Sequence, residues 1–181
     1  MTGLSDRYPE VEVQVQHGDS REVLDRIRGD VLDAGFYNEP REPPEDLCTI
    51  AVSRFDIYLA APAGLLAATK SPDWQSLSEL PWIYPTDGSS CCGHAAETLF
   101  RRHQFRPRKT ISIDREAVTR TLIAGGVGVG LLHADTAIAS RDQGDVDLIY
   151  KAHDGVNVMF AYLKSRANDP LIAAAVTILA E

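Results

Sequence analysis

The sequence predicts an α/β protein of two lobes with a ligand cleft between them. Segments typical of strands and helices alternate along the 181 residues. A strand–helix–strand run comes first, followed by two strands, a longer alternating run, and a last strand and helix. This order favours two α/β lobes, the second inserted into the first. A fully apolar segment behind a pair of glycines, at residues 127–132, supports a sheet covered on both faces.

Residues 115–133 carry the clearest local pattern. Apolar side chains in the first part recur at about one helical turn, which predicts an amphipathic helix behind Asp114. Gly125 and Gly126 end this helix, because glycine accepts the left-handed conformation common at helix ends. Residues 127–132 then form a buried strand, so the stretch is one helix–strand unit of a sheet.

The N-terminal part predicts a strand–helix–strand unit. Residues 11–15 alternate apolar and polar side chains, as a strand with one covered face does. Asp19 or Ser20 is expected to cap the helix that follows, and residues 31–37 form the second strand. The two strands of such a unit should be parallel. Residues 38–46, rich in proline and acidic side chains, are expected to be an exposed loop.

The remaining segments are shorter. Strands are expected at 48–52 and 56–62, separated by Ser53-Arg54-Phe55, and then at 81–85, 109–113, 146–150 and 156–163. Helices are expected at 76–80, after 86–90, at 134–140 and from about residue 171. Lobe I is expected to comprise residues 1–61 with 156–181, and lobe II residues 62–155.

Composition limits the function. A net charge of −8 argues against nucleic-acid binding by this chain itself, because such binding depends on clustered Lys and Arg. Three cysteines, two of them adjacent, form no disulfide framework, so a reducing cytoplasm is expected. The polar N-terminus does not read as a secretory signal, and no apolar run approaches the roughly 20 residues that cross a bilayer.

Four segments in order resemble the effector-binding domain of LysR-type transcriptional regulators: RYPEVEVQVQHGDSREVLDRIRGDVLDAGF, FDIYLAAPAGLLA, SLSELPWIYP and LIAGGVGVGLLH. The resemblance implies the type 2 periplasmic-binding-protein fold, two Rossmann-like lobes joined by two crossing strands. It also implies a cytoplasmic homodimer or tetramer that binds a small-molecule effector, often an organic acid. DNA would be bound only through a helix-turn-helix domain that this chain lacks.

The chain departs from the family pattern in three places. The family's first strand of lobe I has no counterpart here, because Tyr8-Pro9 normally follows it. Asp30 stands where a glycine is usual, and His133 replaces a proline after the buried strand. We therefore expect the sequence to be a fragment whose first lobe is looser than its second.

The resemblance also suggests which residues contact the effector. Helix N-termini offer unpaired N–H groups to a carboxylate, so the contacts are expected at helix starts and strand ends. The expected effector contacts are Ser20, Tyr37, Thr86, Ser89, Ser90, Cys91, Cys92, Asp114, Arg115 and Glu116. Ser20 could equally be only a helix cap, and residues 86–92 an ordinary Asp-Gly turn.

Cys91 and Cys92 allow other interpretations. They lie near the reactive cysteine of the family's peroxide sensors, but Phe100 stands about where those proteins keep their second cysteine. A thiol-based redox sensor is therefore the lesser alternative, and a free-standing solute-binding module is another. No enzyme is expected, because His94 does not face either cysteine well along a helix. The same three residues lack the spacing of a structural zinc site, and no cofactor or metal is expected.

Overall fold

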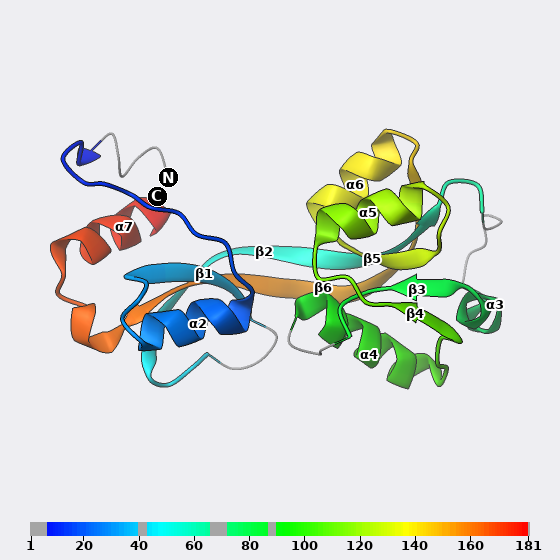
Figure 1. Cartoon of the computed structure of the whole chain (residues 1–181), viewed down its shortest axis with the longest axis horizontal. Helices are drawn as coiled ribbons and strands as arrows, with labels where there is room; N and C mark the ends of the chain where they lie inside the picture. Colours follow the sequence, from blue (N-terminus) through cyan, green and yellow to red (C-terminus); the bar gives the residue numbers. More distant parts are fainter. Residues whose placement is uncertain (1–6, 40–42, 66–71, 87–89, 181) are drawn as a thin grey trace. The chain divides into compact units, whose positions relative to one another are not determined.

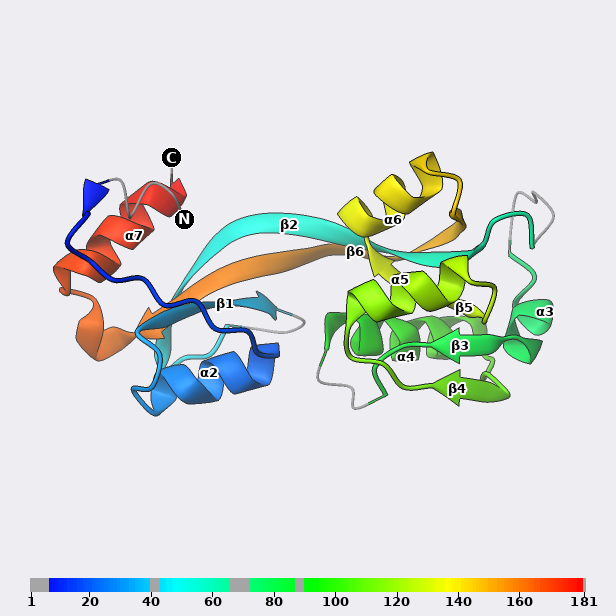
Figure 2. The same ribbon diagram turned by 45° about the horizontal axis from the view of Figure 1, so that its top comes forward.

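The computed structural model describes residues 7–39, 43–65, 72–86 and 90–180, which form two compact units (Figures 1 and 2). The first unit comprises Met1–Arg54 and Asn157–Glu181, and the second comprises Phe55–Val156. Six strands form one sheet in the order β1-β6-β2-β5-β3-β4. The chain changes unit inside β2 (Leu47–Pro62) and inside β6 (Val146–Leu163). The sequence placed the first change at the end of β2, beside Pro62.

β2 and β6 are each continuous, although the sequence predicted a break in both. Ser53-Arg54-Phe55, expected between two strands, lies inside β2. The side chains of Ser53 and Arg54 are exposed in the middle of β2. Strand pairing uses backbone hydrogen bonds, so polar side chains that face solvent do not interrupt it. In β6 the expected break, residues 151–155, ends at Gly155, whose φ is +71° and whose N–H donates to Asp56 Oδ1 at 3.0 Å.

Residues 11–15 are not a strand, so the predicted parallel pair does not form. β1 (Ala34–Glu39) is the outermost strand and pairs antiparallel with β6. The alternating pattern offered one apolar face, but residues 11–15 form no ladder with the edge of β1 that is unpaired in the described structure, and instead line a pocket beside it. Val15 is therefore 71% exposed. A pocket of about 490 Å³ is lined by residues 11–18, by β1 and by α7 (Pro170–Ala180).

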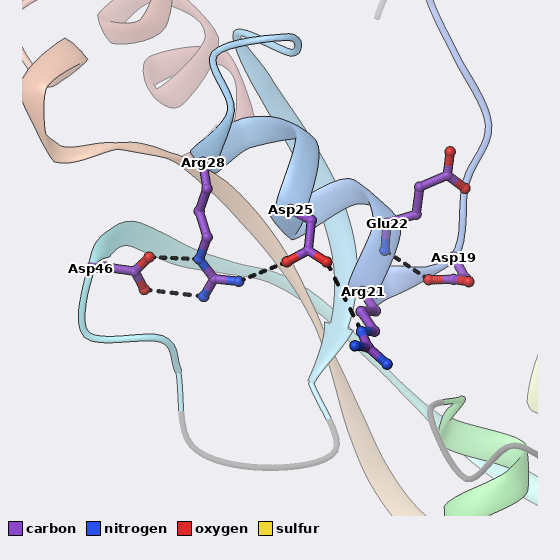
Figure 3. A network of polar contacts seen from close by, with 6 residues as sticks. All are labelled: Asp19, Arg21, Glu22, Asp25, Arg28 and Asp46. Atoms are coloured by element: carbon purple, nitrogen blue, oxygen red, sulfur yellow. Dashed lines mark hydrogen bonds and ion pairs between the residues drawn. The ribbon is translucent and has the colours of Figure 1, made fainter.

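The first unit has its own core under α2 (Ser20–Arg28). Asp19, rather than Ser20, is the cap, and its Oδ1 accepts the Glu22 N–H at 2.8 Å. Val23 and Ile27 lie one turn apart and pack with the side chains of β1, β2 and β6. At the other end of the helix, Arg28 donates two hydrogen bonds to Asp46, of 2.6 and 3.1 Å (Figure 3). These two hydrogen bonds connect the end of α2 to Asp46, the residue before β2.

The second unit is a sheet with helices on both faces (Figure 1). β5 (Val129–His133) is antiparallel to β2 and parallel to β3 (Pro81–Ile83), which is parallel to β4 (Lys109–Ile111). Leu131 packs with α4 (Cys91–His103), whereas the next residue, Leu132, packs with α5 (Glu116–Ala124) and α6 (Ala134–Asp142). The alternation of side chains across a strand thus gives the unit two separate cores.

The expected buried strand after the glycine pair is confirmed. Gly125 ends α5, and Gly126 takes φ +80°. Gly130 lies so close to β3 that a Cβ there would be 2.7 Å from the Ile83 carbonyl oxygen. The short elements α3 (Trp74–Glu79) and η1 (Lys164–Arg166) complete the described structure. No helix within the described ranges is long and apolar enough to cross a membrane.

Candidate functional site

Three helices of the second unit begin around the carboxyl end of β5. α4 begins at Cys91, α5 at Glu116, and α6 directly after His133, the last residue of β5. Each helix N-terminus carries a partial positive charge and unpaired N–H groups, which stabilise negative charge nearby. Polar and ionisable side chains from three separate segments meet here.

The first group is the start of α4. Ser90 caps this helix, and its Oγ accepts the Gly93 N–H at 3.0 Å. Cys91 and Cys92 follow in the first turn and are 7% and 8% exposed. No disulfide joins them. A cysteine at a helix N-terminus is one whose thiolate form the helix favours.

The second group links Cys91 to Glu116 through one imidazole ring. His133 Nε2 lies 3.4 Å from Cys91 Sγ, and Nδ1 lies 3.0 Å from Glu116 Oε2. The backbone N–H of His133 also donates to Glu116 Oε1 at 2.7 Å. The Phe55 ring packs on the imidazole with 4.3 Å between centroids. The carboxylate and the aromatic ring therefore fix the orientation of the imidazole.

These contacts shift the pKa values of all four groups. A hydrogen bond from Cys92, together with the His133 ring, lowers the pKa of the Cys91 thiol to about 5 despite its burial. The pKa of the Cys92 thiol is raised, because it donates to Cys91 and is buried. Burial opposes the charged forms of His133 and Glu116, but their mutual bond and Cys91 raise the His133 pKa to about 10. The Glu116 pKa is lowered, chiefly by His133. Both shifts favour the charged forms of the pair, a thiolate on Cys91 and an imidazolium on His133.

The structure brings together several of the residues expected to contact the effector. Cys91, Cys92 and Glu116 lie together around His133. Ser90 caps α4, whose first two residues are the cysteines. Asp114 and Arg115 lie exposed at the start of α5, where Arg115 occupies the cap position without a side-chain capping bond.

The remaining expected residues have contacts of their own. The Thr86 hydroxyl is 2.8 Å from that of Ser112. Ser89 lies outside the described residues. Ser20 and Tyr37 belong to the first unit, where Ser20 Oγ accepts the Asn38 N–H at 3.0 Å and Tyr37 is buried in the core.

Sequence reasoning missed His133. It was noted only as a replacement for proline, while His94 was weighed as the partner of the cysteines. In the structure the imidazole beside Cys91 belongs to His133, which lies 42 residues further along the chain. The sequence does place His133 directly after a predicted buried strand. Ligand-binding groups gather at the carboxyl ends of strands in α/β folds, so this position could have indicated His133 as a site residue.

Comparison with known proteins decides the family. The LysR substrate binding domain family matches residues 1–181. The chain belongs to this family. Among curated relatives, it is 22% identical over 149 residues to the HTH-type transcriptional regulator CfxR of Cupriavidus necator, covering 82% of this chain and 47% of CfxR. It is 30% identical over 87 residues to the transcriptional activator IlvY of Haemophilus influenzae, covering 45% of this chain and 29% of IlvY. The chain thus spans less than half the length of these relatives.

Solved structures show the same fold. The regulatory domain of Synechocystis PCC6803 CcmR, in complex with 2-PG, superposes with a TM-score of 0.78 at 20% identity, covering 97% of this chain and 85% of that one. The effector-binding domain of QuiR, in complex with shikimate, gives 0.75 at 16% identity, covering 97% and 86%. BenM with benzoate gives 0.72 at 13%, covering 98% and 81%. The LysR-family chain therefore has the type 2 periplasmic-binding-protein fold, as the sequence predicted.

Proposed function

We propose that this LysR-family chain is the effector-sensing domain of a transcriptional regulator. The observation that carries the proposal is the family match along all 181 residues. Regulators named CfxR and IlvY are among its relatives, and both are longer than this chain. The net charge of −8 supports DNA binding through another domain rather than through this one. Binding of the effector would change the arrangement of subunits, in a homodimer or tetramer.

The effector we propose is a small organic acid held at the start of α5. CcmR, QuiR and BenM are described with 2-PG, shikimate and benzoate, and the last two are carboxylates. The first turn of α5 has no side-chain capping bond. The Val118 N–H donates to the Arg115 carbonyl, so we propose that the Glu116 and Ala117 N–H groups bind the anion. Arg115 is exposed beside it, and its guanidinium suits bidentate binding of a carboxylate. The charge of Glu116 is neutralised by His133. Ser20, Tyr37 and Thr86 stay predicted contacts.

Thermal unfolding in the presence of a panel of organic acids, including benzoate and shikimate, tests the proposal. A ligand present at about 100 times its Kd should add roughly 2.7 kcal/mol to the free energy of unfolding, and so raise Tm. Arg115→Gln should abolish most of this rise. Arg101→Gln is the matched control, because Arg101 is an exposed arginine in the last turn of α4. A flat response to every acid in the panel would remove the organic-acid proposal.

A further inference from the structure

We propose that Cys91, Cys92 and His133 form a binding site for one thiophilic metal ion of the Zn²⁺ type. Within the described residues these three side chains place two sulfur atoms and one ring nitrogen within 4.8 Å of one another. Two donors are consecutive residues of the first turn of α4, and the third ends β5. The inference rests on the proposed function and deepens it, because Glu116, which contacts His133, begins α5, where the effector is proposed to bind.

The spacing of the donors suits a metal. Zn²⁺ binds sulfur at about 2.3 Å and imidazole nitrogen at about 2.0–2.1 Å, so tetrahedral ligands are about 3.5–3.8 Å apart. Cys91 Sγ and His133 Nε2 are already 3.4 Å apart. The remaining pairs need to close by no more than about 1 Å, which a rotation of the Cys92 side chain can supply. Three protein donors leave a fourth position open, as in catalytic and sensing sites rather than closed structural ones.

The chemistry of the donors selects the type of ion. Two thiolates and one imidazole are soft to borderline ligands, which favour Zn²⁺ or Cu⁺ over Mg²⁺ or Ca²⁺. Two thiolates also balance the charge of a divalent ion. The cysteines are 7% and 8% exposed, so an ion bound there would be largely shielded from water.

Glu116 supplies the outer contact that metal-binding histidines usually have. Its Oε2 accepts a hydrogen bond from His133 Nδ1, at 3.0 Å, so Nε2 points to the cysteines. Binding of the ion would displace the Nε2 proton and the Cys92 thiol proton to solvent. Glu116 also accepts the backbone N–H of His133 at 2.7 Å, so the carboxylate is held at two points. The Phe55 ring limits rotation of the imidazole from another side. The nitrogen donor is thus oriented before any ion arrives.

Titration of the reduced, metal-free chain with Co²⁺ and then Zn²⁺ tests the site. Co²⁺ bound by thiolates gives a charge-transfer band in the near ultraviolet, and we expect this band to saturate at one ion per chain. Zn²⁺ should then displace Co²⁺ and abolish the band. Cys91→Ser, Cys92→Ser and His133→Gln should each weaken binding at least 10-fold, and Glu116→Gln should weaken it about 10–100-fold.

Cys48→Ser is the matched control, because Cys48 is a free cysteine of the first unit. It should leave the band and the stoichiometry unchanged, and circular dichroism confirms that each variant is folded. A wild-type chain without the band, or a band that survives undiminished in Cys91→Ser or His133→Gln, overturns the metal site. Because the titration contains no organic acid, a chain that binds an acid but no Co²⁺ retains the proposed function and loses only this inference.

Discussion

At the scale of single residues, Ser90 joins local structure to the candidate site. Its Oγ satisfies the Gly93 N–H in the turn that carries both thiols. The sequence suggested Ser90 as an effector contact because a small side chain permits close approach. The capping bond adds a second role, so a large residue there would disturb the helix as well as the site.

We predict that Ser90→Ala lowers the free energy of unfolding by about 1 kcal/mol, because one N–H of the first turn loses its acceptor. Ser90→Asn should retain most of the stability, since asparagine also caps helices. Urea unfolding of the three proteins measures the difference. Equal stability of Ser90→Ala and wild type would mean that the cap contributes nothing.

The candidate site was only partly predictable from sequence. Cys91, Cys92 and Glu116 could be placed at helix starts, because capping and apolar spacing locate those starts to within a residue or two. The partner of Cys91 could not be found in the same way. His133 meets it across 42 residues, and only the tertiary pairing of β5 with its neighbours brings the two together.

At the scale of elements, helices were predicted better than strands. The helical period is read within one segment, whereas a strand exists only where another strand pairs with it. Residues 11–15 have the right alternation but no such partner in the described structure. β2 and β6 continue as strands through their polar segments, because each lies between two other strands of the sheet.

The start of α7 depends on Asp169. Its carboxylate accepts a hydrogen bond from Arg166 at 3.0 Å and from the Leu171 N–H at 2.9 Å. The Arg166 bond, followed by the Leu171 N–H, lowers the pKa of the Asp169 carboxyl below its ordinary value. A lowered pKa in the folded state stabilises the protein above the ordinary value, and this stabilisation disappears as the pH falls through the folded pKa.

We therefore predict that Asp169→Asn lowers the urea midpoint at pH 7, and that the difference from wild type shrinks below pH 3.8, the ordinary value. Asparagine retains the capping oxygen and loses only the charge. Asp135→Asn, in the first turn of α6, controls for the loss of a carboxylate near a helix start. A difference that stays constant down to pH 3 would show that the Arg166 contact has no electrostatic role.

At the scale of the whole molecule, the two units differ in how their strands are paired within the sheet. β5 has a hydrogen-bonded neighbour on both sides, β2 and β3. β1 pairs with β6 and is the last strand of the order, and residues 11–18 face it across the 490 Å³ pocket rather than pairing with it. Val13, Val15 and Phe36 are exposed along this pocket.

We predict that amides of residues 11–18 exchange with solvent at least about 1,000-fold faster than those of β5, because they lack strand hydrogen bonds. β1 should be intermediate, since one of its edges is paired. Hydrogen–deuterium exchange followed by mass spectrometry measures this directly. Equal, strong protection in both segments would mean that residues 11–18 are paired and that the first unit is complete without another strand.

The division of the chain also sets an order during synthesis on the ribosome. The second unit is one uninterrupted run, Phe55–Val156, so every residue it needs is synthesised before Asn157–Glu181. The first unit must wait for Asn157–Glu181, because β1 pairs only with the end of β6. The second unit therefore contains all its own strands and helices before the first unit can close. Residues 34–39 of β1 stay without their strand partner until residues 157–162 of β6 have been made.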